Sequence, residues 1–110
     1  MDGYYHSSDL SRFPDMGKNA PELSARFFDW YGAVFRDGAL TAREKALIAL
    51  GVAHAVQCPY CIDAYTQDTL AKGCDLDQIT EAVHVAAAIR GGASLVHGVQ
   101  MRNVATKLGM

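Results

Sequence analysis

The chain has 110 residues, half of them apolar and a fifth charged, and its formal net charge is −2. This composition is typical of a folded globular protein and excludes an intrinsically disordered chain. The small negative charge provides no basic surface for nucleic acid or for anionic lipid, so we expect neither nucleic acid nor membrane as a partner. Every apolar run is interrupted by a polar residue before it reaches the length of a membrane span.

Residues 1–19 are polar and aromatic and include Pro14 and Gly17. They predict an irregular arm with one short helix over 9–13, suited to wrap a neighbouring subunit. The first residues form neither a basic region nor an apolar stretch, so no signal peptide is expected. We therefore expect a cytoplasmic protein. In that reducing compartment, closely spaced cysteines are more often catalytic or metal-binding than a permanent disulfide.

The first long helix is expected to begin near Pro21, because proline suits the first helical turn. Apolar and aromatic side chains follow at helical spacing from Leu23 to Phe35, which indicates a buried stripe. The Asp37-Gly38 pair ends this helix.

A capping box starts the next helix, since the Thr41 hydroxyl and the Glu44 carboxylate satisfy exposed amides there. The helix continues to Val56 and is apolar nearly all round, so it should be buried on most sides. A third helix opens at or near the cysteines of the segment 58–61 and closes at Gly73.

A fourth helix is expected to start over 75–78 and to carry an apolar run over 82–89. The Arg90-Gly91-Gly92 sequence predicts an interruption before a last helix over about 93–108. No strand-like alternation competes with these patterns. The sequence therefore predicts an all-α fold: one domain over 1–110, with residues 20–110 forming a compact bundle of five to six helices. Two helices without a polar face also predict a homo-oligomer.

Cys58 and Cys61 have CxxC spacing at the expected start of a helix. Free cysteine titrates near ~8.5, and a helix N-terminus lowers that pKa and favours the thiolate. Because the thiolate attacks disulfides and is the form that peroxides oxidise, the motif predicts a redox couple. One alternative is that these cysteines are only small buried residues. Another is a zinc site that includes His54, but a second CxxC or CxxH pair is missing, so we expect no metal.

Four segments carry a family resemblance: 44–50, 54–65, 81–83 and 90–93. They resemble the carboxymuconolactone decarboxylase superfamily, which includes alkylhydroperoxidase D (AhpD), over roughly residues 20–108. The likeness is greatest to short single-core members, including a group associated with arsenosugar biosynthesis. It implies an AhpD-like all-α fold and homo-oligomers that are often trimers or hexamers.

The resemblance also implies a reaction, the reduction of a small hydroperoxide through the cysteine pair. In that scheme peroxide oxidises Cys61, Cys58 resolves the product, and an external dithiol or lipoyl-type reductant recycles the pair. No cofactor is implied. The general argument from helix position depends on where the helix begins, and we expect Cys61 to be the attacking thiol. If the helix begins at Pro59, Cys58 is the N-cap and gains most from the helix dipole; if Cys58 is carried into the core, Cys61 is the activated thiol.

The chain departs from the family pattern at its proton relay. The family uses a glutamate twelve residues before the first cysteine and a histidine four after the second, where this chain has Ala46 and Tyr65. Glu44 lies about 200° round the helix from the relay position, and the capping box also explains it. Tyr65 can form hydrogen bonds, but a pKa near ~10 makes it a poor base at neutral pH.

His54 is one turn before Cys58, and an ordinary pKa of about 6.5 suits an imidazole to proton transfer. We expect His54 to accept the proton of Cys58, with Tyr65 as an orienting partner. The alternative is a core histidine bonded to a backbone carbonyl. Cys74 follows Gly73 and is expected to be a loop thiol outside the redox pair.

These residues favour a thiol-dependent peroxidase of the alkylhydroperoxidase type. The predicted catalytic set is Cys61, Cys58, His54, Tyr65 and Glu44. Two alternatives stay open: a dithiol–disulfide oxidoreductase that prefers protein or lipoyl disulfides, and a non-catalytic oligomeric accessory protein.

Overall fold

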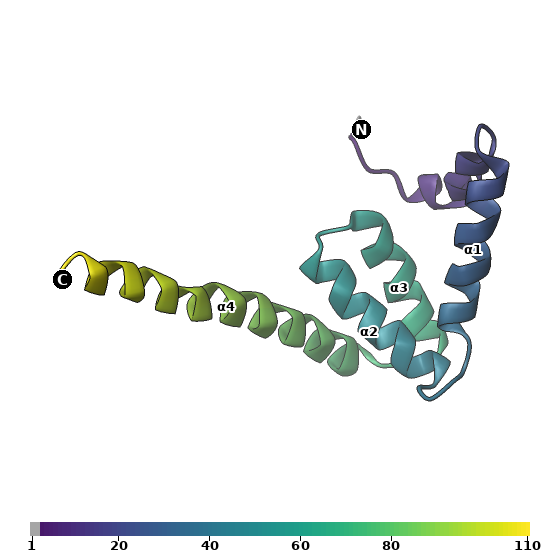
Figure 1. Ribbon diagram of the computed structural model, residues 1–110. Coiled ribbons are helices and arrows are strands. Elements are labelled where there is room, and N and C mark those ends of the chain that lie inside the picture. The colour runs from purple at the N-terminus through teal and green to yellow at the C-terminus, as the bar shows by residue number, and fades with distance from the viewer. Residues whose placement is uncertain (1–2) are drawn as a thin grey trace.

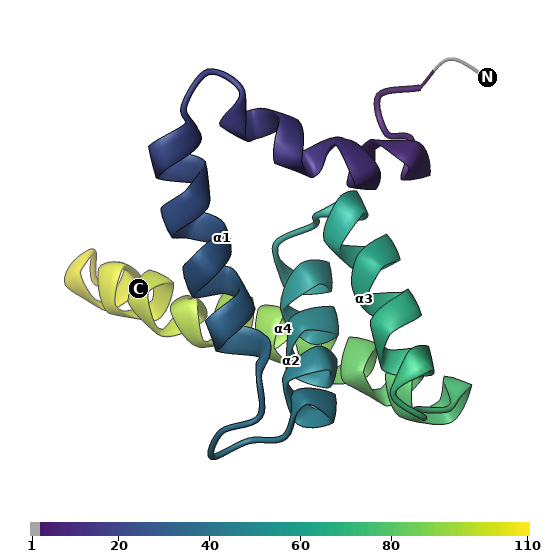
Figure 2. The ribbon, with the colours of Figure 1, turned by 90° about the vertical axis from the view of Figure 1, so that its right-hand side faces the viewer.

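The structure is a computed structural model that describes residues 3–110. It contains a 3₁₀ helix and four α-helices: η1 (Ser7–Gly17), α1 (Pro21–Phe35), α2 (Ala42–Ala55), α3 (Pro59–Ala71) and α4 (Leu76–Lys107). The described residues include no strand, so the all-α fold with five helices is confirmed. Helix α2 is central, because both α3 and the first half of α4 pack against it, while η1 lies across the start of α3 (Figures 1 and 2).

The buried core is small and is built largely from α2. Ala46, Leu50 and Ala53 are its buried positions, and Leu50 packs with Cys74 and Ile79. Alanine at two of these sites lets the neighbouring helix backbones approach closely. The sequence predicted that α2 would be covered on most sides. In one chain this is not so, since side chains such as that of Val52 remain more than half exposed.

The turn from α2 into α3 fixes the backbone of Cys58. Gln57 has φ 59°, in the left-handed region, which ends α2. Its amide donates to the carbonyl of His54 at 3.3 Å, and the amide of Cys58 donates to the carbonyl of Ala53 at 3.0 Å. This pair of bonds is the Schellman motif, which satisfies the last carbonyls of a helix. Cys58 therefore closes α2 and begins α3 in a single residue.

The N-terminal arm is more regular than the sequence predicted. In place of a short helix over 9–13, the 3₁₀ helix η1 extends over Ser7–Gly17 and includes Pro14. Its aromatic residue Phe13 packs on Phe27 and Phe28, with ring centroids 6.2 and 4.8 Å apart. These contacts hold the arm against α1 of its own chain, whereas the sequence suggested a role in wrapping a neighbour.

The predicted break at Arg90-Gly91-Gly92 is wrong, because α4 is a single helix of 32 residues. A glycine inside a helix costs only about 1 kcal/mol relative to alanine, and a capping box between Asp75 and Gln78 secures the start. The second half of α4 projects away from the other helices (Figure 1). The radius of gyration is 18.8 Å, against about 13 Å for a compact domain of this length. A single chain is therefore elongated.

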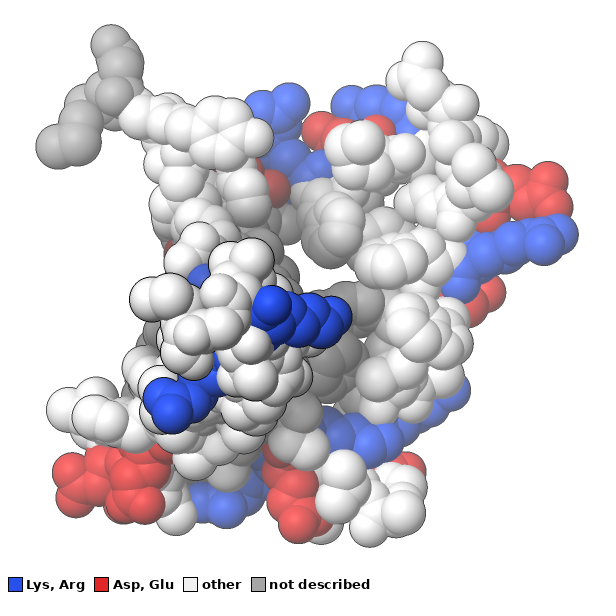
Figure 3. Space-filling view, turned by 60° about the vertical axis from the view of Figure 1, so that its left-hand side comes forward, with Lys and Arg blue, Asp and Glu red and all other residues white. Residues whose placement is uncertain are grey.

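The projecting half of α4 exposes many apolar side chains, among them Leu95 at 81%. Figure 3, seen from this side, shows a largely uncharged surface with two basic groups on its foremost part. Within residues 3–110, no helix combines the length and the apolar character that crossing a membrane requires.

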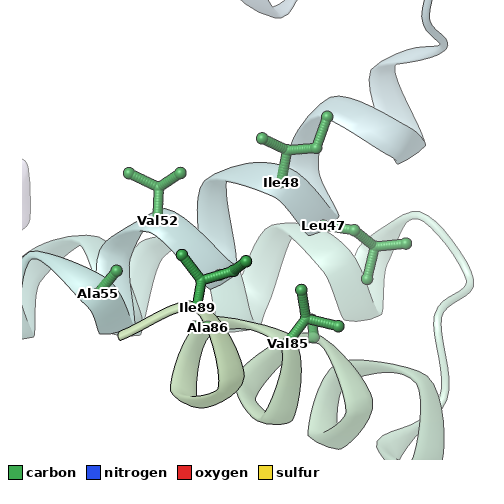
Figure 4. Close-up of a pocket in the computed structure, with 9 residues that line it drawn as sticks. Leu47, Ile48, Val52, Ala55, Val85, Ala86 and Ile89 are labelled. Carbon is green, nitrogen blue, oxygen red and sulfur yellow. The ribbon is translucent and has the colours of Figure 1, made fainter. Parts of the chain in front are cut away.

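An apolar hollow of about 400 Å³ lies between α2 and the first half of α4. Figure 4 shows Val52 of α2 and Ile89 of α4 extending into the same space. The hollow is lined only by aliphatic residues and one glycine: Leu47, Ile48, Gly51, Val52, Ala55, Ala82, Val85, Ala86 and Ile89. The hollow offers no group for acid–base or redox chemistry.

Candidate functional site

Cys58 and Cys61 occupy the N-cap and the third position of α3. The Cys58 sulfur accepts a hydrogen bond from the Cys61 amide at 3.3 Å, and the two Sγ atoms are 2.7 Å apart. Both are free thiols and both are partly buried. A disulfide needs about 2.05 Å between the sulfurs. The pair can therefore close into a disulfide with only a small side-chain movement.

The environment distinguishes the two thiols. An anion at the N-cap is stabilised by the helix amides and dipole, and Cys58 has this position. Burial, a hydrogen bond with Cys58 and the negative charge of Cys58 together raise the pKa of Cys61 to about 11, with burial as the largest cause. Cys58 thus has the position at which a helix N-terminus stabilises an anion, whereas the environment of Cys61 favours its protonated form.

A pocket of about 530 Å³ separates the cysteines from η1. The arm is held there by three hydrogen bonds with α3: the Tyr60 hydroxyl donates to Asp9 Oδ2 at 3.0 Å, and the hydroxyls of Tyr5 and Ser7 both donate to Asp63. The rings of Tyr5 and Tyr60 also lie 4.7 Å apart. The pocket is lined by Asp9, Leu10, Arg12, Phe13, Asp15, Met16, Cys58, Tyr60 and Cys61.

A second, more apolar pocket of about 610 Å³ reaches the same site from the side of α1 and α2. Cys61 lines both pockets, whereas Cys58 lines only the pocket beneath η1. The second pocket is lined by Val34, Phe35, Leu40, Lys45, Ile48, Ala49, Val52, Ala53, Val56, Cys61 and Tyr65.

Tyr65 stands beside Cys61 in this second pocket. Its hydroxyl is hydrogen-bonded to that of Tyr31, and its ring stacks on Phe35 with centroids 5.2 Å apart. Burial raises the pKa of Tyr65 far above its ordinary range, and the bond to Tyr31 adds to this rise. Tyr65 therefore stays protonated and can act only as a hydrogen-bonding group. The sequence assigned Tyr31 and Phe35 to the core stripe of α1, and only the fold shows that they surround Tyr65.

Glu44 is occupied at the start of α2. The Thr41 amide donates to the Glu44 carboxylate at 2.8 Å, and the Glu44 amide donates to the Thr41 hydroxyl at 3.1 Å, so the capping box is confirmed. The bonds with Thr41 hold the pKa of Glu44 below its ordinary value. Glu44 lines neither pocket that reaches the cysteines.

His54 also has a structural partner. Its Nδ1 lies 2.8 Å from the carbonyl of Leu50, to which it donates when the proton is on that nitrogen. No hydrogen bond found within residues 3–110 joins His54 to either cysteine of the motif, and His54 lines neither of their pockets. The contact corresponds to the alternative that the sequence left open, a histidine bonded to a backbone carbonyl.

Cys74 lies in the connection between α3 and α4, as the sequence predicted, but it is only 5% exposed and belongs to the buried core. Its amide donates to the carbonyl of Thr69 at 3.0 Å. In the described part of the chain, no three His, Cys, Asp or Glu side chains are grouped as metal ligands.

The model of the carboxymuconolactone decarboxylase family matches residues 21–101. The chain belongs to this family. A curated relative, "Uncharacterized protein 4 in cox locus" from Paracoccus denitrificans, is 48% identical over 64 residues. That match covers 58% of this chain, and the chain spans 58% of the relative's length.

Solved structures support the membership. A crystal structure of a protein from Methanobacterium thermoautotrophicum has a TM-score of 0.73 and 32% identity, over 76% of this chain and 94% of that one. The apo form of a carboxymuconolactone decarboxylase family protein from Legionella pneumophila has a TM-score of 0.68 and 30% identity, over 84% and 88%. The predicted resemblance is thus confirmed.

This member of the carboxymuconolactone decarboxylase family does not assemble the expected proton relay at the two substituted positions. Ala46 is fully buried against neighbouring helices, and Tyr65 is bonded to Tyr31. The two substituted positions therefore supply no ionisable proton carrier to the cysteine pair.

Proposed function

We propose that the protein is a thiol-dependent peroxidase that reduces hydroperoxides through Cys58 and Cys61. One observation carries this proposal: the two sulfurs lie 2.7 Å apart at the N-terminus of α3 and face a common pocket. Membership of the carboxymuconolactone decarboxylase family supports an enzyme in general. The peroxidase chemistry itself follows from the cysteine pair.

In the first step, the Cys58 thiolate attacks the terminal oxygen of the hydroperoxide. The O–O bond breaks, Cys58 becomes a sulfenic acid, and the alkoxide leaves. The Cys61 thiol donates its proton to the alkoxide, which gives the alcohol and a Cys61 thiolate. This transfer is favourable because the pKa of Cys61, about 11, lies well below that of an alcohol.

In the second step, the Cys61 thiolate attacks the sulfur of the Cys58 sulfenic acid. Hydroxide leaves, takes a proton from solvent and becomes water, and the disulfide is formed. Oxidation of Cys58 removes its negative charge, which was one cause of the raised pKa of Cys61. The pKa of Cys61 therefore falls, and more of it is in the thiolate form, at the step in which Cys61 has to attack.

An external dithiol completes the cycle by thiol–disulfide exchange. It is oxidised to its own disulfide while Cys58 and Cys61 return to the dithiol form. A lipoyl-type dithiol fits this role. Because the cycle begins from a dithiol, the reducing cytoplasm is the proposed compartment.

The direct test is to add one equivalent of cumene hydroperoxide to the reduced protein and to count free thiols. We expect two thiols to disappear per chain, and peptide mapping should find Cys58 joined to Cys61 while Cys74 stays free. Unchanged thiols would refute the peroxidase and leave the dithiol–disulfide oxidoreductase and the non-catalytic alternative. A bridge that includes Cys74 would refute the pairing.

A dithiol–disulfide oxidoreductase is the second candidate, and the buried Ala46 at the relay position favours it. The two activities are separated by comparing the rate at which the dithiol form is oxidised by cumene hydroperoxide and by oxidised lipoamide. A faster reaction with lipoamide would favour the oxidoreductase.

We further propose that the protein is a homo-oligomer, a trimer or hexamer. The projecting half of α4 supports this, because side chains such as Leu95, Val96 and Val99 are more than half exposed there, and contiguous apolar surfaces on this scale indicate a protein partner. Sedimentation should give an oligomer that a Val99→Asp variant dissociates. A wild-type protein that is monomeric at micromolar concentration would refute the assembly.

A further inference from the structure

The arm helix η1 presents two parallel rows of side chains to the cysteine pocket. A 3₁₀ helix has 3.0 residues per turn, so residues three apart stand above one another on one face. Leu10, Phe13 and Met16 form an apolar row with this spacing, and all three line the pocket. Beside it, a charged row also lines the pocket: Asp9, Arg12 and Asp15.

The charged row does not favour an anionic ligand. It carries two carboxylates and one guanidinium, and Arg12 is paired with Asp15 at 3.4 Å. Asp9 is bonded to the Tyr60 hydroxyl. The row therefore offers no free cation for a carboxylate or phosphate. Its neighbour, the apolar row, offers contact to an uncharged hydrocarbon body.

The arm is attached to α3 at the residues that adjoin the cysteines. Tyr60 lies between them in the motif, and Asp63 is two residues after Cys61. Hydrogen bonds from Ser7, Tyr5 and Gln67 hold the pKa of Asp63 below its ordinary value, so the carboxylate is ionised at neutral pH and the attachment is intact there. The position of η1 is thus coupled to the position of the two cysteine thiols.

Helix η1 also lies outside the segment that the family shares. The family match begins at residue 21, whereas η1 ends at Gly17. We propose that η1 is the substrate-selecting wall of the site, and that Leu10, Phe13 and Met16 hold the apolar body of an uncharged organic hydroperoxide against the cysteines. That the bound molecule is a hydroperoxide rests on the peroxidase function proposed above. That η1 selects a ligand with an apolar body does not rest on it.

The test substitutes the most exposed member of the apolar row, Met16, which is 69% exposed and whose loss should not disturb folding. The matched control is Leu23→Gln, at a site on α1 that is 72% exposed and lines no described pocket. In Met16→Gln we expect kcat/KM for cumene hydroperoxide to fall about three- to tenfold, since an apolar contact is lost. The value for hydrogen peroxide, which has no apolar body, should change by less than about twofold. Leu23→Gln should alter neither. An equal change for both peroxides in Met16→Gln would overturn the proposal.

A second measurement does not depend on peroxidase activity. The reduced protein is alkylated with N-phenylmaleimide, which has an apolar ring, and with iodoacetamide, which has none, in a Cys74→Ala background. Met16→Gln should lower the ratio of the two rates, and Leu23→Gln should not. If neither peroxide oxidises the wild type but this ratio still falls, the proposed peroxidase function is refuted and the proposal that η1 selects apolar ligands is supported. If the ratio is unchanged, the wall fails, whatever the peroxides do.

Discussion

The N-termini of α2 and α3 use the same spacing for different purposes. Each has a side chain at the N-cap that accepts a hydrogen bond from the amide three residues later: Thr41 from Glu44 at 3.1 Å, and Cys58 from Cys61 at 3.3 Å. In α2 the second side chain returns the bond, because the Glu44 carboxylate accepts from the Thr41 amide. In α3 the second side chain instead faces the first.

The difference arises from whether the N-cap amide already donates a hydrogen bond to another group. The Thr41 amide has no other partner and takes the carboxylate of Glu44. The Cys58 amide is bonded to the carbonyl of Ala53 by the turn that ends α2. Cys61 is therefore released from capping, and its thiol is free to meet the other sulfur. The local fold thus converts a capping geometry into a close pair of thiols.

The largest effect should come from removing the sulfur at the N-cap while keeping the cap. Serine is a good N-cap residue, so Cys58→Ser should preserve α3 and yet lower peroxide turnover by at least about 10³-fold, as for loss of a nucleophile. With a sulfenic-acid trap, Cys61→Ser should give an adduct and Cys58→Ser should give none. The reverse result would restore the roles that the family resemblance implies.

A smaller effect concerns the proton on Cys61. Two causes of its raised pKa come from Cys58, so in a Cys74→Ala background Cys58→Ser should lower the pKa of Cys61 from about 11 toward ~8.5. The ultraviolet absorbance of the thiolate measures this change. A pKa that stays near 11 would show that burial alone holds the proton.

The same pKa predicts an alkaline limit. The folded state holds the Cys61 proton to about pH 11, whereas the unfolded chain loses it near ~8.5. The contribution of Cys61 to stability is therefore complete below about pH 8.5 and is lost as the pH rises toward the folded value. The slope of unfolding free energy in this interval should be shallower in Cys61→Ser.

A modest effect is expected at the other capped helix. Thr41→Ala removes the acceptor of the Glu44 amide and should lower the free energy of unfolding by about 1 kcal/mol, measured by urea denaturation. Thiol reactivity should not change, because the capping box of α2 is separate from the pocket beneath η1. A fall in peroxide turnover beyond the loss of folded protein would show that Glu44 has a catalytic role after all.

The smallest effect is expected at His54. Since its Nδ1 is bonded to the Leu50 carbonyl, His54→Asn should change turnover by less than about threefold, whereas losing a general base costs ~10²–10⁴. The pH profile between about 6 and 7 should be unchanged. A large loss of turnover, together with loss of the pH dependence between about 6 and 7, would reinstate His54 as the proton acceptor.

The sequence predicted well what depends on local chemistry. Proline and capping residues predicted where three helices begin, at Pro21, Thr41 and Asp75. The CxxC spacing at a helix start located the sulfur pair. Long-range packing was out of reach. Nothing local indicates that Tyr31 meets Tyr65, or that the arm returns to Tyr60, because both contacts depend on how distant helices cross.

The predicted turn at Arg90-Gly91-Gly92 was wrong for a physical reason. Glycines at Gly91 and Gly92 usually end helices, but the cost of about 1 kcal/mol each is small against a helix of 32 residues. Conversely, a left-handed residue at Gln57 ends α2 without a glycine. Side-chain type at one position is a weak guide where the surrounding backbone bonds decide.

The turn at Gln57 has a consequence for how the oxidation state of this protein can be sensed. The end of α2 is completed by backbone hydrogen bonds, and the start of α3 is capped by the Cys58 sulfur, which accepts from the Cys61 amide. The two sulfurs are already in contact. Making or breaking the disulfide therefore asks for almost no rearrangement of the main chain, and the amides of α2 should exchange with deuterium at similar rates in both forms. An oxidised pair would therefore be recognised by a molecule that contacts the two sulfurs, and not by one that detects a change in the main chain.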